Sequence, residues 1–419
     1  MIAPRRFVIC AAVLAAAVAV LPGPLEPAGA RAGPGLVVGV DDDTLKWAWP
    51  GWRFIAAYED LGLSAIRITL RWSPGQPGLD HLEQLYLHRV TTAVMRRNRV
   101  VLSIYGNART APATPEERDE YCEFVADALR RAPSVRDVVI WNEANSPSFW
   151  QPQQGAAAAY GALLARCHDV VHESLRRRVN LIASTAPRHD PRTFIRNLGA
   201  AYRASARTRR IFDTFGHNPY PAGNSEAPFA EHPGSRMIGQ GDYAVLLGAL
   251  TEAFGGTAQP VPGQAGVTIW YLEDGFETAV PFERSGRYTG RELAPTVVQP
   301  VLPQVRTAGV ARDQASQLRD ALGLAYCQPA VGAFFNFQLV DEERLGGWQS
   351  GLLWADGSRK PSYGPFKAAL ADVAAGNVDC GRFPATARGV DPAAALSSRA
   401  CCERSSSTST SHSRARART

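Results

Sequence analysis

The sequence lacks the short motifs that identify the commonest enzyme classes. It has no Walker-type phosphate loop, no GxSxG elbow and no HExxH helix, so nucleotide-binding, serine-hydrolase and zinc-peptidase chemistry are not indicated. It also has no cysteine–histidine spacing typical of a zinc site. After residue 21, no apolar run is long enough to span a bilayer. We therefore expect a chain that needs no metal and no cofactor.

Positive charge is scarce in the body of the chain, although the formal net charge is +6. Residues 1–32 carry +2 and residues 403–419 carry +3, which leaves +1 for residues 33–402. The basic composition therefore comes from the two ends, and the body has no basic stripe for phosphates. We expect no nucleic-acid partner.

The N-terminal segment has the pattern of a secretory signal peptide. Arg5 and Arg6 precede an apolar run over residues 7–21, and small residues over 28–32 offer cleavage sites. The apolar run is too short to span a bilayer convincingly. We expect residues 1–32 to be removed and the mature chain to be a secreted monomer with no membrane attachment.

Apolar runs alternate with helix-like stretches along the rest of the chain. Eight runs have the length and composition of buried strands: residues 36–40, 65–70, 99–105, 138–141, 180–185, 211–217, 267–273 and 331–339. Several intervening stretches repeat apolar residues at helical spacing, as over residues 82–94 and 121–129. Eight strands separated by helices predict an α/β protein with a closed parallel (β/α)8 barrel, the TIM barrel.

An open, doubly wound sheet is the competing architecture. Such a sheet usually has a glycine-rich phosphate turn after its first strand. Here that turn reads GVDDDTLKW, in which Asp41, Asp42 and Asp43 would repel a dinucleotide. The closed barrel is therefore favoured.

The barrel domain is expected to cover residues 33–380. Residues 217–267 and 277–313 are rich in glycine, proline and polar side chains, which predicts long loops after strands six and seven. Loops at this end of a barrel shape the substrate cleft, unless they only decorate its rim. Residues 381–419 lose the apolar pattern, and we expect a disordered tail rich in Ala, Ser and Arg.

Two of the expected strands end in a carboxylate. Residues 138–141 are followed by Asn142 and Glu143, and the run over 267–273 ends in Glu273. Strands four and seven would bring both acids to the same mouth from opposite sides. Cleavage of a glycosidic bond needs such a pair, one as proton donor and one to support or attack the sugar carbon. From the local residues alone, Glu143 could instead cap the following helix.

These motifs resemble clan A of the glycoside hydrolases, the retaining (β/α)8 enzymes that include families 5 and 39. In that clan an Asn-Glu pair ends strand four and a second Glu ends strand seven, which correspond here to Asn142, Glu143 and Glu273. The resemblance spans about residues 36–375. It implies a secreted O-glycosyl hydrolase that cleaves β-glycosidic bonds of oligosaccharides, polysaccharides or other glycosides by double displacement. It also implies Glu143 as acid/base, Glu273 as nucleophile and Asn142 as ligand of the sugar 2-hydroxyl.

Three further positions agree with the clan pattern. Arg67, on strand two, matches an arginine that hydrogen-bonds the nucleophile, although it could also serve as a structural ion pair. His217 and Tyr220, after strand six, match a His-x-x-Tyr pair near the nucleophile, where the tyrosine hydroxyl can donate to the carboxylate. Packing at the rim is the alternative for Tyr220. We expect all three to belong to the substrate site.

Aromatic side chains are expected at the mouth because sugar faces are apolar. Four tryptophans lie in or just after strands: Trp72, Trp150, Trp270 and Trp348. Trp348, in the GGWQSG segment beyond strand eight, is the predicted platform. Trp141 and Trp270 lie within apolar runs, and core packing is predicted for them.

Four other acids rival the predicted pair for a catalytic role: Asp274, Glu277, Asp341 and Glu342. Glu273 is favoured over Asp274 and Glu277 for the catalytic role because it is the first of the three to follow the strand, where the reach into the mouth is shortest. Asp341 and Glu342 follow strand eight, where they could instead bind sugar hydroxyls.

Six of the seven cysteines follow the signal segment, and an exported chain is expected to oxidise them. Cys327 and Cys380 flank the last barrel unit and are expected to pair. Cys122 and Cys167 lie on successive helices, where they either form a bridge or remain buried thiols.

Two other classes of function stay open. One is a carbohydrate-binding barrel without catalysis, which the presence of both Glu143 and Glu273 disfavours. The other is a barrel enzyme that uses Asp41, Asp42 and Asp43 with a metal ion. The sequence leaves open the sugar, the linkage, and whether cleavage is internal or terminal.

Overall fold

The structure is a computed structural model that describes residues 35–48, 51–94, 98–293 and 313–389. The predicted signal peptide lies outside these residues. So does the part of the predicted tail from residue 390 onward.

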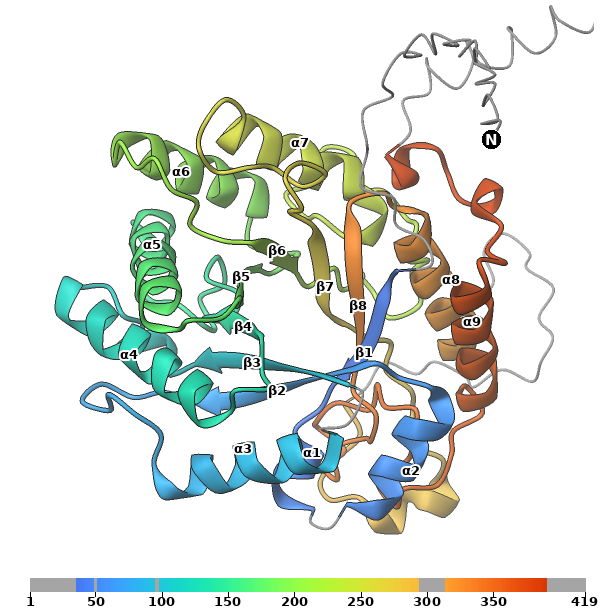
Figure 1. Ribbon diagram of the computed structural model, residues 1–419. Coiled ribbons are helices and arrows are strands. Elements are labelled where there is room, and N and C mark those ends of the chain that lie inside the picture. Colours follow the sequence, from blue (N-terminus) through green and yellow to red (C-terminus); the bar gives the residue numbers. More distant parts are fainter. Residues whose placement is uncertain (1–34, 49–50, 95–97, 294–312, 390–419) are drawn as a thin grey trace, which may run out of the picture.

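Parallel strands form a closed barrel in the order of the chain, with β8 beside β1 (Figure 1). The strands are β1 (Val37–Asp41), β2 (Ala65–Arg71), β3 (Arg99–Tyr105), β4 (Asp137–Ile140), β5 (Asn180–Thr185), β6 (Thr214–His217), β7 (Ile269–Asp274) and β8 (Val331–Phe337). All eight coincide with predicted strands to within a few residues. The predicted (β/α)8 barrel is confirmed, and the open sheet is wrong.

Helices surround the barrel on its outside, as Figure 1 shows. They are α1 (Thr44–Trp47), α2 (Trp52–Leu61), α3 (His81–Val94), α4 (Pro115–Arg131), α5 (Ala156–Ser174), α6 (Pro191–Ala204), α7 (Tyr243–Phe254), α8 (Gln314–Cys327) and α9 (Tyr363–Ala375). Short 3₁₀ turns are η1 (Ala108–Thr110), η2 (Gln240–Asp242), η3 (Phe282–Arg287), η4 (Cys380–Arg382) and η5 (Thr386–Arg388). Among the described residues, no helix is both long and apolar enough to cross a bilayer.

Local sequence signals explain where individual helices begin and end. Helix α4 begins with a capping box, in which the Thr114 side chain accepts from the Glu117 N–H and Glu117 reaches back, with Pro115 in the first turn. Helix α2 ends at Gly62, whose φ of +73° places it in the left-handed region that glycine tolerates best. These caps satisfy backbone groups that the helix ends leave unpaired.

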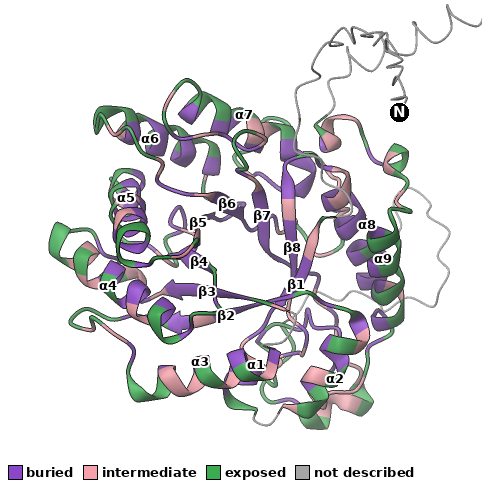
Figure 2. Ribbon diagram, viewed as in Figure 1, coloured by how far each residue is buried: buried purple, intermediate pink, exposed green. Residues whose placement is uncertain are grey.

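The core has two parts, and strand alternation separates them. Outward-facing strand residues pack against the helices, so the barrel wall and the inner helix faces are buried while the outer helix faces are exposed (Figure 2). Inward-facing residues form a separate apolar cluster: Ala65, Val101, Val139, Ile182, Trp270, Leu272, Ala333 and Phe335. Two residues further along their strands, Arg67 and Ser103 also face inward. The barrel interior is therefore apolar below and polar at the carboxyl ends of the strands.

The predicted loop boundaries need correction. Residues 218–239 form a loop after β6, but the prediction that the loop extends to residue 267 is wrong, because residues 243–254 form α7. The glycines and prolines that flank this segment concealed its apolar helical run. After β7, residues 275–293 include η3, and residues 294–312 lie outside the described part.

The C-terminal boundary of the barrel domain also lies later than predicted. Residues 381–389 are described, and Phe383 and Ala387 are buried against Leu324 of α8. A boundary at residue 380 is therefore too early, because these two apolar side chains complete the packing of the last barrel unit.

Two disulfides lie on the outside of the barrel. Cys327 at the end of α8 bonds Cys380 in η4, which confirms the predicted pair. Cys122 on α4 bonds Cys167 on α5, so the buried-thiol alternative for these two residues is wrong.

Candidate active site

A cleft with a volume of about 1150 Å³ opens at the carboxyl ends of the strands. This is the end at which (β/α)8 barrels carry their binding residues. Loop residues 220–224, after β6, and Gly275 and Glu277, after β7, contribute to its walls. The two loops that the sequence singled out therefore do line the cleft.

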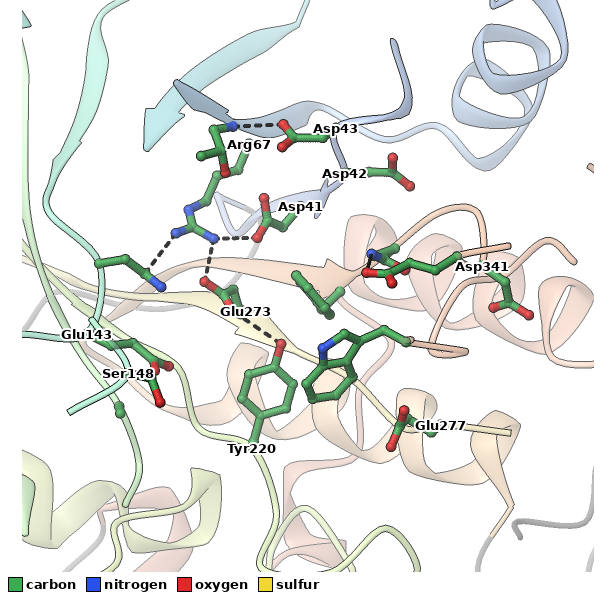
Figure 3. A pocket seen from close by; sticks show the side chains of 18 of the residues that line it. Asp41, Asp42, Asp43, Arg67, Glu143, Ser148, Tyr220, Glu273, Glu277 and Asp341 are labelled. Carbon is green, nitrogen blue, oxygen red and sulfur yellow. Dashed lines mark hydrogen bonds and ion pairs between the residues drawn. The ribbon is translucent and has the colours of Figure 1, made fainter. Parts of the chain in front are cut away.

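Arg67 organises the floor of this cleft. It projects inward from β2, is 1% exposed, and donates hydrogen bonds to side chains from four other strands or strand ends. These are Asp41, Glu273 at 2.7 Å, Ser103 at 2.8 Å and Asn142 at 3.1 Å. Figure 3 shows the contacts with Asp41 and Glu273. Burial would lower the pKa of Arg67, but the charges of Asp41 and Glu273 outweigh it and raise that pKa, so the guanidinium stays charged.

Glu273 is held from two sides. Its Oε1 accepts from Arg67 Nη1, and its Oε2 accepts from the Tyr220 hydroxyl at 3.3 Å (Figure 3). Burial, and then the charge of Glu273, raises the pKa of Tyr220 well above its usual value, so this hydroxyl keeps its proton and remains a donor. The carboxylate is thus fixed in position at the end of β7, facing the cleft.

Glu143 lies just beyond β4 in an unusual backbone conformation. Both Trp141 and Glu143 have positive φ, +60° and +41°, which non-glycine residues rarely adopt. The Glu143 N–H donates to the Ser184 hydroxyl at 3.2 Å, and its Oε1 accepts from Asn218 Nδ2 at 2.8 Å. The backbone turn therefore aims the carboxyl group into the cleft, which it lines.

The protonation of Glu143 differs from that of an ordinary glutamate. Burial, and then the negative charge of Glu273, raises its pKa to about 8, although the Asn218 hydrogen bond and the Arg67 charge act in the opposite direction. At neutral pH, Glu143 is therefore a neutral carboxylic acid that can donate a proton.

Two buried tyrosines support the end of β4 from outside the barrel. The Tyr121 hydroxyl on α4 accepts from the Trp141 N–H at 2.9 Å. The Tyr160 hydroxyl on α5 donates to the Ile140 carbonyl at 2.8 Å and accepts from the Ser184 N–H at 2.8 Å. These hydroxyls bond backbone groups where β4 diverges from its neighbours, and so hold the segment that carries Glu143.

Asn142 is buried but still lines the cleft. Its Oδ1 accepts from Arg67 Nη2 at 3.1 Å and from the Ser184 hydroxyl at 3.5 Å. Within the described part of the chain, no hydrogen bond uses its Nδ2. This amide can therefore donate to a ligand between the two glutamates.

His217 does not lie in the cleft, and its predicted contact with substrate is wrong. It is fully buried, its Nε2 lies 2.8 Å from the Ile238 carbonyl, and its Nδ1 lies 2.9 Å from the Thr185 hydroxyl. Burial lowers the pKa of His217 to about 4, so the ring is neutral, with Nε2–H donating to the carbonyl and Nδ1 accepting. The next residue, Asn218, makes the contact with Glu143 instead.

Trp348 lines the cleft as predicted, with 38% of its surface exposed. It stacks at a tilt on Tyr220, with ring centroids 5.4 Å apart, and meets the edge of Phe337 at 5.1 Å. Trp72 and Trp150 are buried around Trp141 and do not line the cleft, so their predicted stacking role is wrong. The Trp72 ring packs against Tyr121 and the Trp150 ring packs against Tyr160, so both tryptophans lie on the helix side of β4.

Trp141 and Trp270 are buried in the two parts of the core, which confirms their predicted packing role. Trp141 belongs to the layer between sheet and helices, and Trp270 to the cluster inside the barrel.

Of the four rival acids, Glu277, Asp341 and Glu342 line the cleft, whereas Asp274 does not. Asp274 points away from the cleft, and burial raises its pKa well above the usual value. Asp341 forms a fully buried ion pair with Lys360 at 2.7 Å and accepts from the Tyr288 hydroxyl at 2.9 Å. The Oε1 atom of Glu342 accepts from Gln338 Nε2 at 3.5 Å, and its Oε2 atom accepts from Arg344 Nη2 at 3.3 Å.

The run of three aspartates does not form a common ligand set. Asp42 accepts from backbone N–H groups of Thr44, Leu339 and Val340, and Asp43 pairs with Lys46. Asp41 faces Arg67, and burial raises its pKa well above the usual value. Because their oxygens take separate partners, the metal-based alternative loses its structural basis.

Sequence reasoning missed four polar residues of this network. The sequence suggested Asp41 only as a barrier to a dinucleotide or as a metal ligand, and it did not suggest Ser103, Ser184 or Asn218. Strand alternation is a signal that could have found Ser103, because it lies opposite Thr69 on β2 and two residues after the inward-facing Val101. The same alternation could have found Ser184, two residues after the inward-facing Ile182 on β5, whereas no comparable signal marks Asn218.

The structure is a closed (β/α)8 barrel in which Glu143 and Glu273 line the cleft. No protein-family model matches the chain, and no curated protein matches its sequence. Solved structures do match its fold. A family 39 glycoside hydrolase from the gut symbiont Bacteroides cellulosilyticus WH2 matches with a TM-score of 0.55 and 16% identity, over 81% of this chain and 63% of that chain.

Two further structures are similar to a comparable degree. A monomeric beta-xylosidase from Caulobacter crescentus CB15 matches with a TM-score of 0.50 and 15% identity, over 82% of this chain and 69% of that chain. A GH5_18 glycoside hydrolase from Bifidobacterium longum subsp. infantis matches with a TM-score of 0.51 and 13% identity, over 81% and 79%. The fold is therefore that of clan A glycoside hydrolases, in agreement with the resemblance seen in the sequence.

Proposed function

We propose that this protein is a retaining glycoside hydrolase that cleaves β-O-glycosidic bonds, with Glu143 as acid/base and Glu273 as nucleophile. The observation that carries the proposal is the difference between the two carboxyl groups. Glu143 is a neutral acid because burial and Glu273 raise its pKa, whereas Glu273 accepts hydrogen bonds on both oxygens from Arg67 and Tyr220. Two carboxyl groups whose surroundings assign them different roles are typical of glycosidases.

The first step forms a glycosyl-enzyme. A Glu273 oxygen bonds to the anomeric carbon, the bond from that carbon to the leaving oxygen breaks, and Glu143 gives its proton to the leaving oxygen. Arg67 and the Tyr220 hydroxyl hold the attacking carboxylate, and Asn142 Nδ2 is free to donate to a sugar hydroxyl beside it.

The second step restores the enzyme. Water attacks the anomeric carbon and gives a proton to the Glu143 carboxylate, and the bond to Glu273 breaks. The two displacements leave the sugar with its original β configuration.

The substrate is proposed to be a glycoside, oligosaccharide or polysaccharide, with one sugar ring against Trp348. Aryl β-xylosides belong among the first compounds to test because a structural neighbour is a beta-xylosidase. We further propose, from the N-terminal sequence, that the mature chain is secreted and acts as a monomer.

The test uses the mature protein beside Glu143→Ala and Glu273→Ala, a panel of activated aryl β-glycosides, and azide. In Glu143→Ala, azide should intercept the glycosyl-enzyme and give a β-azide. In Glu273→Ala, azide should replace the nucleophile and give an α-azide. Glu342→Ala, which removes another carboxylate of the cleft, should still hydrolyse the glycosides and should form no azide product.

The products decide the roles. The opposite pair of azides would reverse the assignments of Glu143 and Glu273. An α-configured first product from the wild-type enzyme would exclude a retaining mechanism. Binding of oligosaccharide without turnover of any sugar would instead favour the non-catalytic barrel.

A further inference from the structure

A second polar cluster lies at the opposite end of the barrel from the cleft. His168 and His172 are one turn apart near the C-terminus of α5, and Asp213 immediately precedes β6. In a (β/α)8 barrel, residues just before a strand lie at the face away from the active site. The proposed glycosidase reaction makes no use of these three residues.

Their ligand atoms converge on one point. One nitrogen from each imidazole and one oxygen of Asp213 all lie within 4.8 Å of one another. His172 Nε2 is 3.3 Å from Asp213 Oδ2, and His168 Nε2 is 3.9 Å from Oδ1. Ligands about 2.0–2.1 Å from a tetrahedral zinc ion lie roughly 3.3 Å apart. Side-chain movements of less than about 1 Å would therefore bring the His168 and His172 nitrogens to the separations from Asp213 that ligands of one zinc ion have.

His168 provides an independent sign of a missing ligand. Its side chain is more than nine-tenths buried, and its Nε2 has no hydrogen-bond partner. The 3.9 Å to Asp213 is too long for a hydrogen bond. Buried polar atoms are nearly always satisfied, so an orphaned imidazole nitrogen that faces a second imidazole and a carboxylate needs an explanation.

The surroundings suit a borderline divalent cation. The Leu181 N–H donates to Asp213 Oδ2 at 3.0 Å and fixes the carboxylate. Arg210, 3.3 Å from Asp213 Oδ1, is the competing cation, and its half-exposed side chain can turn to solvent.

We propose that His168, His172 and Asp213 bind one zinc ion, which ties α5 to the start of β6. Two imidazole nitrogens and one carboxylate oxygen are a common zinc ligand set, with water able to reach a fourth position beside the partly exposed His172. The absence of cysteine–histidine motifs led the sequence analysis to expect no metal. A His-x-x-x-His pair on a helix with a distant aspartate becomes visible only once the barrel brings α5 and β6 together.

The test measures zinc binding by the untagged mature protein after treatment with a chelator. Titration calorimetry should give one zinc ion per chain, and zinc should raise the Tm by several degrees because it binds only the folded state. His172→Ala removes a ligand at a partly exposed position, and Asp213→Asn preserves an acceptor for the Leu181 N–H. Each should weaken zinc binding by at least about 100-fold.

His88→Ala is the matched control, because His88 is an exposed histidine on α3. It should bind zinc with the affinity of the wild type. In the cobalt-loaded protein, the visible absorption of four-coordinate cobalt should appear in the wild type and be lost in His172→Ala. Absence of stoichiometric zinc binding by the wild type, or binding by both ligand variants with the affinity of the wild type, would show that the three side chains form only an ion-paired contact between α5 and β6.

Discussion

Replacing Glu143 with glutamine should make the stability of the protein less dependent on pH while removing the proposed acid catalyst. Glutamine has the size of glutamate and can still accept from Asn218, but it cannot ionise. In the wild type, burial and the charge of Glu273 raise the pKa of Glu143 from 4.5 to about 8. The variant therefore isolates the free energy of ionising this one group.

The sign and size of the effect follow from proton linkage. The folded chain holds the Glu143 proton more tightly than the unfolded chain does, so the associated stability is fully present below pH 4.5. It is lost as the pH rises from 4.5 through about 8. Because one unit of pKa corresponds to about 1.4 kcal/mol, the wild type should lose on the order of 5 kcal/mol relative to Glu143→Gln.

Urea unfolding of both proteins between about pH 4 and about pH 9 measures this difference. The free energy of unfolding of Glu143→Gln should overtake that of the wild type as the pH rises. Glu59→Gln, at an exposed position on α2, should show no comparable trend. A difference between Glu143→Gln and the wild type that stays constant across this range would refute the assigned protonation of Glu143. In the same range, kcat/KM of the wild type should fall as the pH rises through about 8.

Three further variants test other parts of the site. Tyr220→Phe removes the donor to Glu273 Oε2 and should lower kcat by about 10- to 100-fold, measured with an aryl glycoside. Lys360→Met leaves Asp341 buried without its partner and should cost about 3–5 kcal/mol in the free energy of unfolding, measured with urea. Trp348→Ala removes the exposed ring and should raise KM by about fivefold with a smaller change in kcat, since a stacking contact of about 1 kcal/mol serves mainly to bind.

Each of these variants has a control on the outside of the barrel. Tyr326→Phe on α8 should leave kcat unchanged. Lys367→Met breaks only an exposed pair with Asp60 and should leave the free energy of unfolding nearly unchanged. Trp52→Ala, at an exposed position on α2, should leave KM unchanged. If a control and its partner variant behave alike, the effect is not specific to the cleft.

The order of strands was predictable because each strand is a short apolar run buried on both faces. Glu143 and Glu273 were predictable for the same reason, since an acid directly after such a run must lie at the mouth of the barrel. Helix α7 was missed because the local composition on either side of it is typical of loops. The buried C-terminal residue Phe383 was missed because single apolar residues in a polar segment carry no periodic signal.

The details of the site depend on the direction in which each side chain points, which the sequence does not show. His217 and Asn218 are adjacent, but the pleat sends His217 into the core and leaves Asn218 to meet Glu143. In the same way, Trp150 follows a strand in sequence yet faces the helix layer, whereas Trp348 faces the cleft. A residue's place after a strand predicts its height in the barrel but not the side to which it points.

The Cys122–Cys167 disulfide links the two helices whose tyrosines support the end of β4. Cys122 adjoins Tyr121 on α4, and Cys167 lies two turns from Tyr160 on the same face of α5. The bond therefore couples the redox conditions under which the chain folds to the position of Glu143. A chain with these thiols reduced would keep both Glu143 and Glu273 but hold Glu143 less firmly, so oxidation of two cysteines on the outer helices contributes to the arrangement of the cleft.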